Sequence, residues 1–166
     1  MDTHAIPLDE FDQEMATTRR LLERVPDDQG EWRPHKKSFP LAHLAQLVSS
    51  IPSWIARTLR TTELSLDEGP GYSIQPTSAL ISAFDKNVRE AREALETVTG
   101  KDLEPEWSLK SGEHVLYSAP RGAAARGHLN HLIHHRGQLT VYLRLLDVPL
   151  PSIYGPTADE KWGESR

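Results

Sequence analysis

Apolar residues recur every three or four positions along four stretches of the chain, which is the pattern of amphipathic helices. The first stretch runs from Leu8 to Val25 and stops at a polar, proline-containing segment. The second begins at Ser38, a predicted N-cap, tolerates Pro40 in its first turn and contains Pro52, which should kink it. Its apolar stripe consists of Leu41, Leu44, Val48, Ile51, Ile55 and Leu59.

The third and fourth stretches are separated by a segment with a different pattern. The third helix is expected to begin at Thr77 or Ser78, to reach about Val98 and to close at Gly100. Between residues 103 and 120, apolar triplets flank a Ser-Gly pair, which indicates a short hairpin or another extended excursion.

The fourth helix is expected over Arg121–Asp147, with Pro149 ending it. Four long helices with one irregular connection predict an all-α fold, a four-helix bundle. No internal repeat is visible, and we expect a single domain over residues 1–166.

The composition fits an ordinary folded domain, with 37% hydrophobic and 26% charged residues in 166. Acidic residues number 24 against 19 basic ones, and this net charge of -5 predicts neither a nucleic-acid partner nor an anionic membrane. Cysteine is absent, which excludes disulfides and thiolate metal ligands. The N-terminus lacks the pattern of a signal peptide and no apolar run is long enough to span a bilayer, so we expect a cytoplasmic protein.

The inner face of the fourth predicted helix changes from apolar to imidazole side chains. Counted back from its C-terminus at spacings of three and four, this stripe contains Leu146, Tyr142, Leu139, His135, His131 and His128. His131 and His135 are four residues apart, so they should lie one above the other and could bind one divalent ion. Buried imidazoles without a metal must be neutral and hydrogen-bonded, and both interpretations, metal site and structural histidines, stay open.

Other residues near this stripe have simpler interpretations. His134 should lie at its rim, and Arg136 and Arg144 should pair with acidic neighbours, although either could bind a substrate carboxylate. Gly137 costs a helix interior about 1 kcal/mol relative to alanine, which predicts a close helix approach within the bundle or at a dimer contact. Three more histidines are expected on the surface: His4, His35 and His114.

Two regions of the sequence resemble one known family. Residues Asn130–Gln138 followed by Tyr142–Leu146 look like the C-terminal signature of DinB-like proteins, and Pro151–Glu160 extends the match. Residues Trp32–Trp54 are similar to the family's first half. The resemblance implies a four-helix bundle in up-down-down-up order, often a homodimer, whose members commonly hold a divalent metal through three histidines. Some relatives use low-molecular-weight thiols as cosubstrates.

The resemblance places two of the three family ligands on His131 and His135. The third position, two residues after the Leu-Ala pair of the second helix, is occupied by Leu47, which cannot bind a metal. The nearest replacement is His43, about 6 Å earlier along the helix axis. Antiparallel packing of the two helices would shift His43 toward His135, so a rebuilt site and a degenerate site both remain possible.

Two functions follow from these alternatives. The first is a metal-dependent transferase or hydrolase, in which zinc or nickel on His131, His135 and His43 activates water or a thiol toward a small-molecule substrate. The second is a non-catalytic, stress-related bundle whose metal site has been lost at Leu47. The sequence identifies no catalytic residue beyond these candidate ligands.

Overall fold

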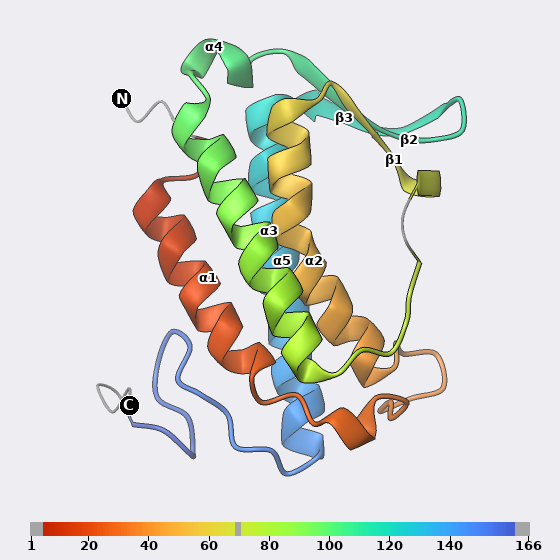
Figure 1. Cartoon of the computed structure of the whole chain (residues 1–166), viewed down its shortest axis with the longest axis vertical. Helices are drawn as coiled ribbons and strands as arrows, with labels where there is room; N and C mark the ends of the chain where they lie inside the picture. The colour runs from red at the N-terminus through yellow and green to blue at the C-terminus, as the bar shows by residue number, and fades with distance from the viewer. Residues whose placement is uncertain (1–4, 69–70, 162–166) are drawn as a thin grey trace.

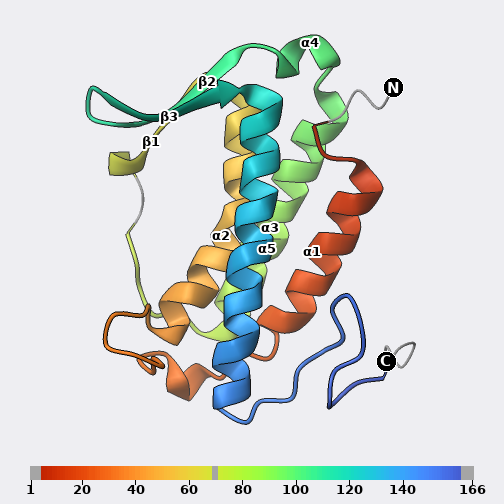
Figure 2. The same ribbon diagram turned by 180° about the vertical axis from the view of Figure 1, so that it is seen from behind.

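The computed structural model describes residues 5–68 and 71–161, which are mostly helical. In this part of the chain the long helices are α1 (Leu8–Leu22), α2 (Leu41–Arg60), α3 (Thr77–Thr97) and α5 (Arg121–Leu145). They lie side by side, with α1 and α5 running in one direction and α2 and α3 in the other (Figures 1 and 2). None of these helices is apolar over a length that could cross a membrane.

Short elements join the long helices and include a small three-stranded sheet, so the predicted helical bundle is confirmed as a mostly helical fold but not as a purely all-α one. The short helical elements are the 3-10 turns η1 (Asp27–Gln29) and η2 (Leu66–Glu68) and the helix α4 (Gly100–Leu103). The strands are β1 (Glu63–Ser65), β2 (Glu106–Ser111) and β3 (His114–Pro120). The predicted hairpin between the third and fourth helices is confirmed as β2–β3, while β1 pairs in parallel with β2. β1 escapes prediction because three residues are too few to show an alternating pattern.

Proline fixes the start of each long helix. Pro7, Pro40, Pro76 and Pro120 occupy the N-cap positions of α1, α2, α3 and α5 with extended ψ angles and no capping side chain. Proline has no N–H to bond back, and it disfavours the helical conformation for the residue before it, which explains why each of these helices begins directly after its proline. The predicted N-cap Ser38 is therefore wrong, and α2 begins at Leu41.

Helix ends also differ from the predictions. α1 stops at Leu22, and Gly100 begins α4 instead of closing α3. Thr99 explains this second difference, because its side chain and that of Asp102 form a reciprocal capping box at the start of α4. Pro52 lies inside α2, whose ribbon bends along its length (Figure 1).

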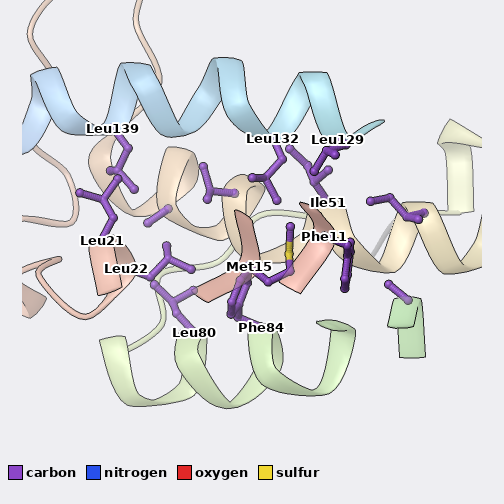
Figure 3. Close-up of a cluster of buried hydrophobic side chains, with 14 of the residues drawn as sticks. Phe11, Met15, Leu21, Leu22, Ile51, Leu80, Phe84, Leu129, Leu132 and Leu139 are labelled. Carbon is purple, nitrogen blue, oxygen red and sulfur yellow. The ribbon is translucent and has the colours of Figure 1, made fainter. Parts of the chain in front are cut away.

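All four long helices contribute to the main core (Figure 3). Its labelled side chains are Phe11, Met15, Leu21, Leu22, Ile51, Leu80, Phe84, Leu129, Leu132 and Leu139. On α5 the fully buried line runs through Leu132, Arg136, Leu139 and Leu143. The predicted inner stripe is therefore displaced by about one residue, and His131 and His135 lie at the edge of the core, partly exposed.

Candidate functional site

His131 and His135 approach each other closely on α5. Their Nε2 atoms are 2.7 Å apart and their ring centroids 4.5 Å apart. This contact needs at least one neutral ring with a free lone pair, because two protonated nitrogens would both present hydrogen. The spacing of four residues thus produces the convergence of imidazole nitrogens that the sequence predicts.

Gln138 orients the second histidine of this pair. Nδ1 of His135 lies 2.8 Å from Oε1 of Gln138, one helical turn further along α5. An amide oxygen only accepts hydrogen bonds, so Nδ1 of His135 carries the proton and donates it. Nε2 of His135 consequently keeps a lone pair that faces His131. Metal-binding histidines are commonly held by this kind of contact at the other ring nitrogen.

The surroundings of His131 favour its neutral form. Burial lowers its pKa, and the positive charges that His135 and His134 can carry lower it further. The Trp54 ring of α2 lies against it, with centroids 5.7 Å apart. His131 is thus neutral near neutral pH, and in its contact with His135 its Nε2 donates a proton that a metal ion would replace.

His128 has a structural environment that the sequence did not reveal. Its Nε2 lies 3.0 Å from the hydroxyl of Thr58, and its ring meets the rings of Trp54 and Trp107 edge-on, each at 5.8 Å. Burial lowers its pKa to about 4. Because these partners come from α2 and β2, His128 joins the bundle to the small sheet.

His43 is placed away from this pair, in an aromatic stack. Its ring lies between Phe39 at 4.4 Å and Tyr72 at 4.5 Å, and burial lowers its pKa. Together with Leu47 it lines a cavity of about 580 Å³ along α2. Within residues 5–68 and 71–161, no three histidine or acidic side chains are grouped to hold a metal ion. The structure brings His131 and His135 together but does not bring His43 to them.

The remaining predicted histidines lie where they were expected, as far as the structure describes them. His134 is exposed at the rim, with its ring centroid 5.0 Å from that of His135. His35 and His114 are exposed as well. His4 falls outside the described residues.

Arg136 and Arg144 of α5 form the predicted ion pairs. Arg136 is 1% exposed and its Nη1 lies 2.6 Å from a carboxylate oxygen of Glu14, while Arg144 pairs with Asp159. The close approach expected at Gly137 is wrong within the bundle, because a Cβ there would meet no described atom within 4 Å. Gly137 instead lies on the exposed face of α5.

The donor set fits a metal ion in part. Zinc–imidazole bonds of about 2.0–2.1 Å at tetrahedral angles put two ligand nitrogens roughly 3.3 Å apart, so His131 and His135 need to separate only slightly. No third ligand stands in the family position, because Leu47 offers only hydrocarbon. A cavity of about 390 Å³ adjoins His135 and leaves room for a small molecule. Its lining consists of residues 37–39, His135, Gln138, Val141 and Tyr142.

The sequence and the fold of this chain are both similar to those of known proteins. The sequence model of the DinB family matches residues 1–164. The uncharacterised protein YrdA of Bacillus subtilis is 26% identical over 166 residues, covering 95% of this chain and 90% of YrdA. The crystal structure of a DinB-like protein of B. subtilis, YjoA, superposes with a TM-score of 0.69 at 20% identity over 88% of this chain and 96% of that one. A DinB-like protein of Bacillus cereus gives 0.70 at 21% identity over 89% and 95%.

Proposed function

Because the chain belongs to the DinB family, we propose that it binds one divalent metal ion through His131 and His135 and uses it as a transferase or hydrolase acting on a small molecule. The observation that carries this proposal is the 2.7 Å approach of the two Nε2 atoms. The contact from Gln138 to Nδ1 of His135 supports it, because it points the free lone pair of that ring at the shared position.

Zinc or nickel would supply Lewis-acid chemistry there, activating water or a low-molecular-weight thiol as a nucleophile near neutral pH. The chain's own residues would bind and orient. His131 and His135 provide imidazole nitrogens, Gln138 fixes the tautomer of His135, and Trp54 shields one side of His131 from water. The 390 Å³ cavity beside His135 is the proposed place for the substrate.

His43 would become a third ligand only by leaving its stack between Phe39 and Tyr72.

The experiment that tests the metal site is elemental analysis of protein made without an affinity tag or chelators. We expect near-stoichiometric metal in the wild type and its loss in His131→Ala and His135→Ala. His134→Ala, which changes an exposed neighbouring histidine, is the matched control and should keep the metal. Metal retained by both ligand variants would refute the proposal, and His43→Ala distinguishes two protein ligands from three.

A second candidate function rests on the absence of a three-residue ligand group among the described residues and on Leu47. In this alternative the chain is a non-catalytic, stress-related bundle whose metal site has degenerated. Wild-type protein would then stay metal-free after zinc or nickel is offered, and Leu47→His should create tight binding by restoring the family ligand.

We also propose that the protein is a homodimer in which α5 packs against its symmetry mate. Gly127 and Gly137 stand five residues before and after Leu132, both on the exposed face. At 100° per residue they lie within about 80° of each other, and Val141 falls between them. A twofold axis at the middle of an antiparallel helix pair would place each glycine opposite the other.

A further inference from the structure

The larger cavity lies along one face of α2 and is not used by the metal proposal. It has a volume of about 580 Å³, within the range of small-molecule sites. The α2 residues that line it are spaced three and four apart over four turns: His43, Gln46, Leu47, Ser50, Ser53, Trp54 and Arg57. Residues 64–66, Gly71, Tyr72 and Asn87 complete the lining from β1, η2, the following loop and α3.

The polar groups of this lining are largely committed to the backbone. The hydroxyls of Ser50 and Ser53 donate to carbonyl oxygens one turn earlier in α2, each at 2.8 Å or less. The side-chain amide of Asn87 donates to the carbonyl of Ser49 at 2.9 Å. Gln46 accepts from the backbone N–H of Ser73 and so ties the loop to the helix. These contacts leave Trp54 and Leu47 as the main surfaces for a ligand body.

The charge of the lining has one sign. None of its residues is acidic, although the chain carries 24 Asp and Glu. Arg57 forms no ion pair with any side chain that the structure describes, whereas the neighbouring Arg60 faces Glu93 at 3.7 Å. Arg57 is exposed at the rim of the cavity, one turn from the indole of Trp54, and a guanidinium with no described carboxylate partner in this position suits a planar anion.

We propose that this cavity binds a small organic carboxylate with an aromatic or similarly flat apolar body. The carboxylate pairs with Arg57, and the body lies on Trp54 and Leu47. This site goes beyond the proposed metal function and does not require it. Trp54 is the residue shared by the two sites, since its ring also contacts His131.

The test uses two probes of the same shape and different charge, 1-naphthaleneacetate and 2-(1-naphthyl)ethanol, titrated calorimetrically into the full-length protein. We expect the wild type to bind the anion more tightly than the alcohol. Arg57→Gln should weaken the anion about tenfold, the scale of one charge-assisted contact, and leave the alcohol unchanged. Arg60→Gln, which removes a paired arginine one turn away, should change neither affinity.

A filling variant locates the site. Ser50→Phe places a ring in the cavity and should abolish binding of both probes in protein whose melting temperature and helical circular dichroism match the wild type. Equal affinity for the two probes, equal losses in Arg57→Gln and Arg60→Gln, or no binding of the anion by wild-type protein would overturn the proposal. Metal content, measured separately, distinguishes this failure from failure of the histidine site.

Discussion

At the scale of single residues, His128 shows how burial makes a histidine sensitive to acid. Its folded-state pKa of about 4 lies below the ordinary value of 6.5 because burial disfavours the charged ring. Between these values the unfolded chain binds a proton that the folded chain does not. The contribution of His128 to the unfolding free energy is therefore fully present above pH 6.5 and is lost as the pH falls toward 4.

We expect His128→Gln to flatten this dependence. Glutamine can still bond to Thr58 but does not titrate, so from pH 7 to 4.5 the variant should lose about 2 kcal/mol less unfolding free energy than the wild type. Urea unfolding at several pH values measures the difference. His134→Gln, at an exposed position, should follow the wild-type curve, and parallel curves for all three proteins would contradict the assignment.

The sequence predicts single residues well only where their partners are close in the chain. His131 and His135 could be paired from their spacing, and Gln138 lies one turn further on the same helix. The partners of His128, Thr58 and Trp107, are distant in the chain, and His43 stacks on the distant Tyr72 as well as on the nearby Phe39, so no local pattern reveals these environments in full. Whether His43 of α2 could reach His131 and His135 of α5 was likewise not visible in the sequence, because it depends on how the two helices pack.

At the scale of elements, periodicity located every long helix but misplaced the inner face of α5. Leu132, Leu139 and Leu143 define the buried line, and Arg136 falls on it, paired with Glu14 of α1. A charged residue within a leucine stripe was therefore the available signal of a buried ion pair. The histidines were a poorer guide, because counting back from Leu146 started beyond the last residue of the helix.

Removing one partner of the Arg136–Glu14 ion pair should lower the unfolding free energy strongly, whereas replacing both partners with apolar residues should lower it little. Glu14→Leu leaves Arg136 buried without its carboxylate and should lower the unfolding free energy by about 3–5 kcal/mol. Adding Arg136→Met removes the unpaired charge and should recover most of that loss. Denaturant unfolding of the single and double variants measures these changes in unfolding free energy. The control is Glu90→Leu, which breaks the exposed ion pair with Lys86 and should lower the unfolding free energy by less than about 1 kcal/mol. A double variant no more stable than Glu14→Leu would show that the pair stabilises the fold.

At the scale of the whole molecule, the exposed face of α5 packs little against the part of the chain that the structure describes. A Cβ added at Gly127 or Gly137 meets none of the described atoms within 4 Å, and Val141 and Leu145 on the same face are each 57% exposed. Two glycines in an exposed helix cost about 1 kcal/mol each relative to alanine. Close approach of a second α5 would account for both the glycines and the exposed apolar side chains.

The dimer proposal makes opposite predictions for assembly and for the single chain. Gly127→Glu and Gly137→Glu should each convert a dimer to a monomer, measured by sedimentation equilibrium, because a long charged side chain separates the helices. The same changes should leave the isolated chain folded and somewhat more stable, since glutamate favours helix over glycine by roughly 0.5 kcal/mol or more. Ala83→Glu, at an exposed position of α3, should remain dimeric. Wild-type protein that is monomeric at all concentrations would exclude this interface. The two glycines would then destabilise α5 without any contact that compensates for it.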